Sequence, residues 1–229
     1  EMPGYYVGIT KYAQELLDDL ELLKNDWPSQ VLTMQENWIG RSEGLEFKFD
    51  ISLESRAKLD RAFTKYFVFT TRPDTIYGVT YSALSPEHPI VKYIVENELL
   101  PKNKINAIKN MQKVPERERG TLEKEGIDLE IEAIHPLTGQ RDFEFAKKYN
   151  LPIKQVIVGV NGLIEKQTEA FVDDGVLIDS ESFSGLKNSD AKQAIIYHFE
   201  QNSFGIKKVN FKLRDWGVSR QRYWGAPIP

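Results

Sequence analysis

Strict alternation of hydrophobic and polar residues marks one segment of the chain as a strand. The apolar members of this segment, residues 45–53, are Leu45, Phe47, Phe49, Ile51 and Leu53. Because successive side chains of a strand point to opposite faces, the pattern predicts a strand with one buried face. Shorter apolar runs predict further strands over residues 66–70, 153–160 and 209–213.

Apolar residues at helical spacing predict two helices before the first of these strands. One is expected over residues 11–24, with Thr10 as its N-cap. The second is expected over residues 27–41, with Pro28 in its first turn, where a missing amide hydrogen costs nothing.

The rest of the chain mixes helix and strand without a regular βαβ rhythm. Residues 86–126 are expected to be helical, with interruptions at Pro101, Pro115 and Gly120. A last helix is expected after Asn188 or Ser189. This order favours an α+β fold over a doubly wound sheet. We therefore predict a mixed, largely antiparallel, β-barrel-like sheet with peripheral helices.

Composition narrows the classes of chemistry open to the chain. Its 229 residues include no cysteine, which excludes disulfides, thiolate zinc sites and cysteine nucleophiles and favours a cytoplasmic protein. The three histidines, His88, His135 and His198, are far apart, so no metal site is predicted. A net charge of −4 argues against coating of a polyanion, and no apolar run is long enough to span a membrane. The uncapped ending "YWGAPIP" predicts a fragment of a larger protein.

Three groups of polar residues are candidates for a functional site. The first, "FTTRPDTIYG" over residues 69–78, places threonines around an arginine and an aspartate directly after a predicted strand. It is either a turn whose hydroxyls bind local backbone groups or the polar wall of a pocket. The second group, over residues 139–152, has a pattern that predicts the start of an amphipathic helix. The third, over residues 213–229, interleaves arginines with aromatic rings, which suits nucleic-acid contact or an interdomain corner.

Taken together and in this order, these groups resemble the region around the inserted editing domain of leucyl-tRNA synthetase. The resemblance rests on "MQENWIGRSEG" (34–44), "TTRPDTIYGVTY" (70–81), "HPLTG" (135–139), "RDFEFAKKYNLPIKQVI" (141–157) and "LRDWGVSRQRYWGAPIP" (213–229). Isoleucyl and valyl relatives typically carry a WTTTPWT-type peptide in place of the second motif. The ATP-binding signatures of the synthetic core are missing, so the chain itself is not expected to activate leucine.

The resemblance implies a role for each matching residue. Asp142 would bind the α-ammonium group of the substrate, and Thr70 and Thr71 would order the attacking water beside the ester. Thr75 would obstruct the branched end of leucine, and Arg72 would orient the loop or meet the terminal nucleotide. Tyr77 and Arg141 complete the implied substrate-binding set, while Asp74 is interpreted as a structural turn residue.

The implied activity is hydrolysis of mischarged tRNA(Leu) carrying isoleucine, valine, methionine or norvaline. The implied partners are the tRNA(Leu) acceptor end and the mischarged amino acid, with no membrane, and a monomer is expected. No cofactor is expected for the fragment, whereas the parent ligase would use ATP and magnesium. Residues 1–44 would lead in from the synthetic core, 45–213 would form the editing domain, and 214–229 would return to the core. The competing interpretation is a non-catalytic module that binds the tRNA end.

One departure from the family pattern lies between Gly139 and Gln140. The resemblance implies further strands and a glycine-rich loop there, and this sequence has none of them. Either the segment is deleted, or it belongs to the protein and is missing only from the printed sequence. A Cα–Cα separation near 3.8 Å between the two residues would indicate a deletion. A deletion variant would be inactive in editing, because Asp142 would lose its flanking loop.

Overall fold

The structure is a computed structural model, and it describes residues 5–79, 81–114, 125–134, 154–159 and 174–217. It contains two compact units. We call Leu45–Lys207 the central unit, and we call the two segments Glu1–Gly44 and Lys208–Pro229 together the terminal unit. The three-part division expected from the sequence stays a prediction.

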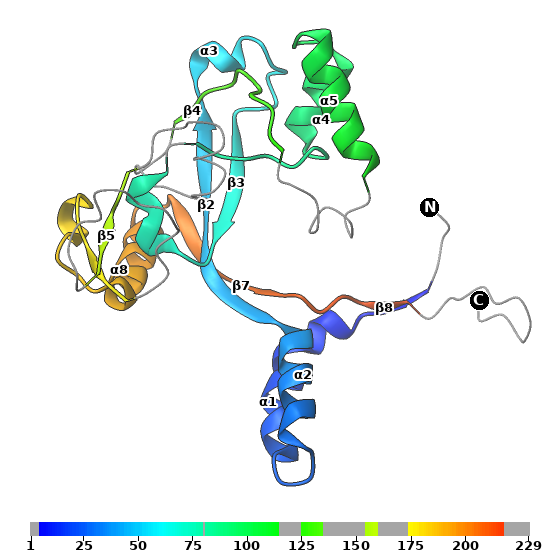
Figure 1. The fold of residues 1–229 in the computed structure, drawn as a ribbon, viewed down its shortest axis with the longest axis vertical. Helices are drawn as coiled ribbons and strands as arrows, with labels where there is room; N and C mark the ends of the chain where they lie inside the picture. Colours follow the sequence, from blue (N-terminus) through cyan, green and yellow to red (C-terminus); the bar gives the residue numbers. More distant parts are fainter. Residues whose placement is uncertain (1–4, 80, 115–124, 135–153, 160–173, 218–229) are drawn as a thin grey trace, which may run out of the picture. The chain divides into compact units, whose positions relative to one another are not determined.

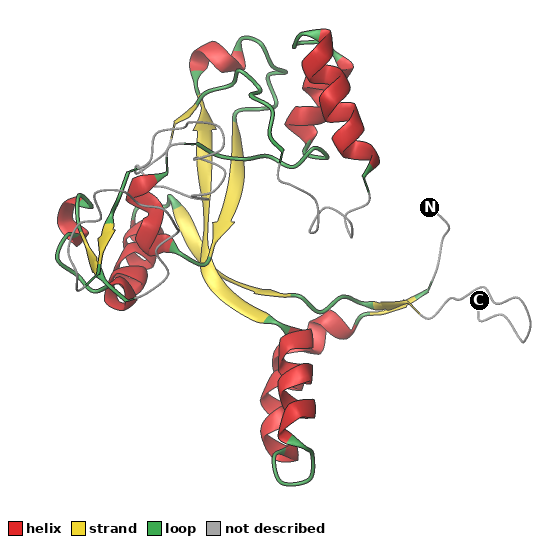
Figure 2. Ribbon diagram, viewed as in Figure 1, coloured by secondary structure: helices red, strands yellow, loops and turns green. Residues whose placement is uncertain are grey.

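Strand β2 (Arg41–Ile51) pairs with β3 (Lys65–Thr70) in antiparallel register (Figures 1 and 2). The part of β2 that makes this pairing, from Leu45 onward, belongs to the central unit. The short strand β4 (Ala133–Ile134) is also antiparallel to β2, and β7 (Gly205–Phe211) pairs with β2 as well. The two-residue strands β5 (Ile157–Val158) and β6 (Val176–Leu177) form a separate antiparallel pair. The α+β class is confirmed, but the strands of the described residues do not close into a barrel, so a barrel-like sheet is not confirmed.

The alternating pattern of β2 has the predicted consequence for burial. Leu45, Phe47, Phe49 and Ile51 are all buried. Leu53 was expected on the same face, but it is 80% exposed, because the strand ends at Ile51. A short helix, α3 (Leu53–Arg56), begins there, and the Ser52 hydroxyl accepts a hydrogen bond from the Ser55 amide at its start.

Two helices of the central unit, α4 (Pro89–Glu96) and α5 (Lys102–Lys113), begin at or beside a proline. They are the helices described within the range predicted to be helical, residues 86–126. The interruption predicted at Pro101 is confirmed, and this proline is the N-cap residue of α5. Residues 115–124 lie outside the description. The Nδ1 atom of His88 caps α4 by accepting a hydrogen bond from the Ile90 amide at 3.2 Å.

The later part of the central unit contributes the longest helix described, α8 (Asn188–Gln201), and the 3₁₀ turn η4 (Glu181–Phe183). Lys187 occupies the N-cap position of α8, one residue before the predicted cap. The strand predicted over residues 153–160 is described only as β5, since part of that range lies outside the described residues.

Aromatic rings join the sheet to α8 in the core of the central unit. The Phe47 ring meets the Phe199 ring of α8 edge to face at 5.5 Å, and Phe49 stacks on Tyr66 at 5.3 Å. Helix α8 also contacts the 3₁₀ helix η3 (Pro73–Gly78), which follows β3 directly. The threonine-rich peptide therefore follows a strand and contacts helix α8, one face of which is buried.

The terminal unit is built from two strands and a helical hairpin. Strand β1 (Tyr6–Val7) pairs antiparallel with β8 (Trp216–Gly217). The helix predicted over residues 11–24 is divided into η1 (Ile9–Tyr12), α1 (Ala13–Asp19) and η2 (Leu20–Leu23).

The helix starts predicted at Pro28 and at Thr10 have different outcomes. Helix α2 (Ser29–Ile39) follows Pro28 as expected and ends at Gly40, whose positive φ of 58° suits glycine. Thr10 does not cap α1. Its hydroxyl and its amide instead donate hydrogen bonds to the Asp215 carboxylate at 2.7 and 3.1 Å. The strand expected over residues 209–213 occurs earlier, as β7.

Candidate active site

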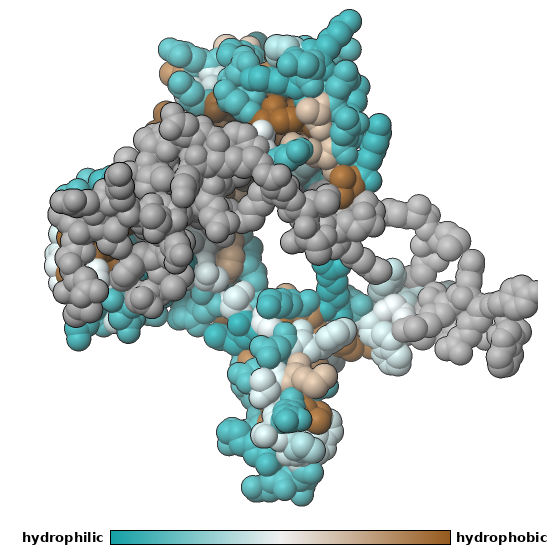
Figure 3. Space-filling view, in the orientation of Figure 1, coloured by the Kyte–Doolittle hydropathy of each residue, from teal (hydrophilic) through white to brown (hydrophobic). Residues whose placement is uncertain are grey.

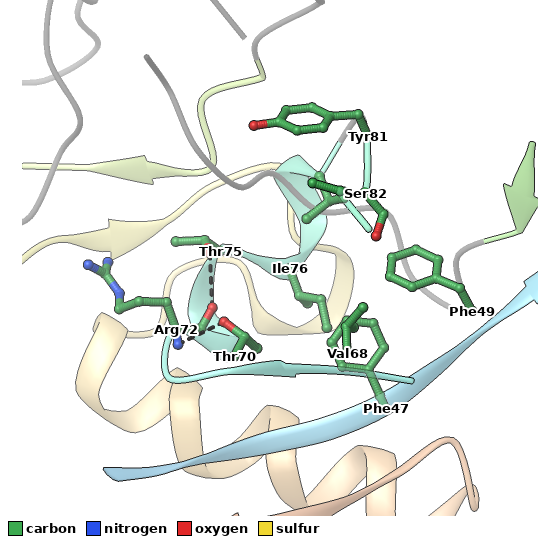
Figure 4. A pocket seen from close by; sticks show the side chains of 11 residues that line it. Phe47, Phe49, Val68, Thr70, Arg72, Thr75, Ile76, Tyr81 and Ser82 are labelled. Carbon is green, nitrogen blue, oxygen red and sulfur yellow. Dashed lines mark hydrogen bonds between the residues drawn. The ribbon is translucent and has the colours of Figure 1, made fainter. Parts of the chain in front are cut away.

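A cavity of about 220 Å³ lies in the central unit beside the threonine-rich peptide (Figure 4). Strands β2 and β3 and helix η3 supply most of its wall, and the segment after η3 supplies the rest. The lining residues are Phe47, Phe49, Val68, Thr70, Arg72, Thr75, Ile76, Val79, Tyr81, Ser82 and Ala83. The cavity is therefore a largely apolar space with a few hydroxyl groups and one cation at its wall, as expected of a small-molecule site.

Thr70 stands at the end of β3 with its side chain in this wall. It is buried, and its Oγ1 atom accepts a hydrogen bond from the Arg72 amide at 3.0 Å. A hydroxyl that accepts from the backbone keeps its own hydrogen for donation. Thr70 therefore offers a hydrogen-bond donor to an oxygen atom placed in the cavity.

Thr75 lies one turn further along, in η3, and also lines the cavity. Its Oγ1 atom donates to the Arg72 carbonyl oxygen at 2.9 Å. Because the hydroxyl is used in this way, the side chain contributes bulk to the wall chiefly through its methyl group. Figure 4 shows both threonines beside the Arg72 backbone, with the two hydrogen bonds drawn as dashed lines.

The Arg72 side chain is held by Asp74 in a two-pronged ion pair. Arg72 Nε lies 3.1 and 3.0 Å from the two carboxylate oxygens, and Nη2 lies 2.8 Å from Oδ2. Asp74 is completely buried, whereas the Arg72 side chain is 29% exposed. The interpretation of Asp74 as a turn residue is thus incomplete, because this carboxylate anchors the one cation that lines the cavity among the described residues.

Two predicted site residues do not line the cavity in the described part of the chain. Thr71 is exposed, because residues that follow one another at a strand end point to opposite sides. Tyr77 is buried against Phe183, with ring centroids 6.0 Å apart. Burial, followed by the negative charge of Glu181, raises the pKa of Tyr77 to about 12. The assignments of Thr71 to water ordering and of Tyr77 to substrate binding stay predictions.

The remaining polar groups of the wall are neutral. Ser82 is hydrogen-bonded to Tyr66, and burial raises the pKa of that phenol above its ordinary value. Among the described lining residues, none carries a carboxylate or an imidazole. In the described ranges, no three histidine, aspartate or glutamate side chains are grouped in a way that could hold a metal ion. None of the described helices has the length and apolar character to cross a bilayer.

Several predicted residues cannot be placed. Arg141 and Asp142, together with Gly139 and Gln140, lie outside the described residues. Of the arginine- and aromatic-rich group, Arg214 and Trp216 belong to the terminal unit, and the positions from 218 onward lie outside the description.

Sequence reasoning missed most of the apolar wall. The alternation in β2 had already placed Phe47 and Phe49 on one face, and the register of β3 sets Val68 opposite Phe47. That signal identified a buried face but gave no indication that part of this face borders a cavity. Val79 and Ser82 follow η3, where the sequence carries no periodic pattern at all.

Comparison with known proteins assigns the family. The family model described as "Leucyl-tRNA synthetase, editing domain" matches residues 36–141 and 138–200, which together are more than half of the chain. The chain belongs to the leucyl-tRNA synthetase family. Its relatives include the leucine–tRNA ligases of Aliarcobacter butzleri (strain RM4018), 75% identical, and Campylobacter concisus (strain 13826), 50% identical. Each alignment covers 100% of this chain and 31% of the relative, so the chain spans about a third of their length.

A solved structure agrees with this assignment. The leucyl-tRNA synthetase of Agrobacterium radiobacter K84, in a ternary complex described as LeuRS-tRNA-LeuAMS, matches with a TM-score of 0.69 at 30% identity. The match covers 100% of this chain and 27% of that one. The cavity beside the threonine-rich peptide therefore lies in a leucyl-tRNA synthetase editing domain.

The alignments also bear on the junction between Gly139 and Gln140. The alignments to the two named ligases run over 256 residues, against 229 in this chain, a difference of 27. The family model matches in two stretches that meet at residues 138–141. Both observations agree with a segment of the leucyl-tRNA synthetases that has no counterpart at this junction.

Proposed function

We propose that this chain is the part of a leucyl-tRNA synthetase that hydrolyses mischarged tRNA(Leu). The observation that carries the proposal is the cavity itself, in which Thr70 and Thr75 of the editing-domain peptide share one wall with Arg72. Its volume of about 220 Å³ is below the ~300–1,000 Å³ typical of drug-sized ligands, which suits an amino-acid side chain.

The reaction is hydrolysis of the ester that joins an amino acid to the terminal ribose. A water oxygen bonds to the ester carbonyl carbon, and the bond between that carbon and the ribose oxygen then breaks. The ribose oxygen takes up the proton that the water loses, which releases free amino acid and tRNA. The Thr70 hydroxyl donates to the oxygen that gains charge in this step. Because the described wall offers no general base, rate acceleration rests on the positioning of the water.

Selection against leucine is the second requirement of this function. A synthetic site discriminates poorly between side chains that differ by one methylene, an effect worth only ~1–3 kcal/mol, so a second site must remove the errors. The Thr75 methyl group supplies the obstruction in this proposal, since the hydroxyl is bonded to the Arg72 carbonyl. Substrates that lack a second methyl group on the γ-carbon enter the cavity, and leucine, which has two, is excluded.

A series of Thr75 variants tests the steric role. Thr75→Ser keeps the hydroxyl and removes the methyl group, and Thr75→Ala removes both, so each variant should begin to hydrolyse leucyl-tRNA(Leu). Thr75→Val keeps the bulk and loses the hydrogen bond, so it should continue to spare leucyl-tRNA(Leu). The measurement is deacylation of leucyl- and isoleucyl-tRNA(Leu). Protection of leucine by the serine variant would remove the methyl group from the discriminator role.

Deacylation by the unaltered chain separates catalysis from binding alone. Turnover of isoleucyl-tRNA(Leu) is expected, and binding of the tRNA end without turnover would favour the non-catalytic module. Asp142→Ala should weaken substrate binding by ~2–5 kcal/mol, the typical cost of a lost buried charge partner. If the shorter junction at Gly139 removes the pocket wall around Asp142, the chain will not hydrolyse the ester.

The remaining properties in this proposal belong to the whole synthetase. The tRNA(Leu) acceptor end and a mischarged amino acid are the partners, and the relative from Agrobacterium radiobacter, solved together with tRNA, supports the first of these. The parent ligase uses ATP and magnesium, acts as a monomer in the cytoplasm, and completes a barrel-like editing sheet.

A further inference from the structure

The backbone of Arg72 links the two threonines that line the cavity. Its amide donates to Thr70 Oγ1 at 3.0 Å, and its carbonyl accepts from Thr75 Oγ1 at 2.9 Å and from the Thr75 amide at 3.1 Å. A rotation of this one residue would therefore move a hydroxyl on one side and a methyl group on the other.

The orientation of Arg72 is fixed in turn by Asp74. Three contacts of 2.8–3.1 Å join the guanidinium to the carboxylate. Asp74 is fully buried, and a buried carboxylate is retained only where its charge is paired. The planar fork of arginine matches both oxygens, so the pair fixes a direction as well as a distance.

We propose that Asp74 is a positioning residue for discrimination in this editing site. Acting through Arg72, it holds the Thr70 donor and the Thr75 methyl group at one fixed spacing across the cavity wall. This inference rests on the proposed function and adds to it a residue that does not line the cavity itself. If Asp74 is lost, the wall loosens, so that leucine is admitted and the reacting ester is held less well.

A purely structural ion pair would behave differently. Its loss would lower the stability of the whole central unit. Hydrogen exchange would then become faster at every amide that exchanges through unfolding of this unit. A positioning role predicts instead a local change at Arg72, beyond any change at a reference amide. The Ile51 amide, bonded to the Thr64 carbonyl at 2.9 Å, is a suitable reference in the same unit.

Hydrogen exchange followed by NMR on the whole chain tests this difference. In Asp74→Asn, the Arg72 amide should exchange about tenfold faster relative to the Ile51 amide than in the unaltered chain. Asp60→Asn is the matched control, because it makes the same charge change at an exposed carboxylate that accepts from the Ala62 amide. Equal acceleration of both amides, or of neither, would overturn the proposal.

Arg72→Lys keeps the positive charge beside Asp74 but loses the planar guanidinium that contacts both carboxylate oxygens. This variant provides a second test if Asp74→Asn fails to fold. The amide of residue 72 should again exchange faster than the reference, by a similar factor.

Deacylation supplies the functional readout. Relative to the unaltered chain, both variants should lower the preference for isoleucyl- over leucyl-tRNA(Leu) about tenfold, mainly through kcat. An unchanged preference in an active protein would contradict the proposal. If the unaltered chain hydrolyses neither ester, the proposed function fails, and the exchange measurement still decides whether Asp74 positions Arg72.

Discussion

The central and terminal units differ in how they bury their hydrophobic residues. In the central unit one cluster of buried residues runs from Leu45 to Phe199 and borders the cavity. In the described part of the terminal unit the buried hydrophobic residues are Ala13, Ile39 and Leu213, while Trp38 is 71% exposed. On the visible face over α1 and α2, pale and brown residues lie among hydrophilic ones (Figure 3). The unit that holds the candidate site is thus also the unit with a core of its own.

This difference is open to direct measurement because the tryptophans are unevenly distributed. All four of them, Trp27, Trp38, Trp216 and Trp224, belong to the terminal unit by sequence. Tryptophan fluorescence therefore reports on the terminal unit, while far-UV circular dichroism also includes α4, α5 and α8. Unfolding followed by both signals separates the two units if they unfold independently.

The largest expected effect comes from the core of the central unit. Phe47→Ala removes a ring that contacts Phe49 and Phe199, and it should lower the free energy of unfolding by ~3–5 kcal/mol. Urea unfolding followed by circular dichroism measures this loss. The fluorescence transition should move much less.

Trp38→Ala is the counterpart in the terminal unit. The side chain is mostly exposed, so its removal should change stability by no more than ~0.5 kcal/mol. Losses of similar size in the two variants would show that the units do not differ in the way that burial implies.

A smaller effect is expected at a glycine where β7 meets β2. A Cβ atom on Gly205 would lie 2.5 Å from the Glu46 carbonyl oxygen and 2.9 Å from Phe47 Cβ. The strand would have to shift, so Gly205→Ala should cost ~1–3 kcal/mol. Gly8→Ala in the terminal unit is the control, because its nearest neighbour would be the Lys11 side chain at 3.8 Å. Stability unchanged by Gly205→Ala would contradict the close approach of the strands.

The sequence predicted the parts of this molecule that depend on local pattern. Alternation located β2 and its buried face, and the threonine-rich peptide pointed to Thr70 and Thr75, which share the cavity wall. It could not show that Thr71 points outward, since that depends on where β3 ends.

The ion pair that Asp74 makes with Arg72 also could not be predicted from the sequence pattern. An aspartate after a proline is typical of an exposed turn, whereas Asp74 is buried in a 3₁₀ helix that contacts α8. Helical spacing over residues 11–24 predicted a helix but gave no sign that both of its ends would be 3₁₀ turns. The segment that follows η3 carries no periodic pattern from which its conformation could be predicted.

The smallest expected effect is a difference in pH dependence between the units. In the central unit, burial lowers the pKa of His88 below its ordinary 6.5, and its Nδ1 atom must be unprotonated to accept from the Ile90 amide. In the terminal unit, hydrogen bonds from the Thr10 hydroxyl and amide lower the pKa of Asp215 below 3.8. Each shift contributes stability that is lost on acidification, but in a different range of pH.

For His88 the unfolded chain binds the proton more readily, so its contribution is complete above about pH 6.5 and declines as the pH falls from there. The contribution of Asp215 is present above pH 3.8 and is lost only as the pH falls through its lowered pKa. Between about pH 6.5 and 4, the histidine should therefore weaken the central unit alone. Urea unfolding across this range tests the prediction, and His88→Asn should flatten the dependence, because asparagine caps a helix without titrating. An equal pH dependence in the variant would mean that His88 does not cause it.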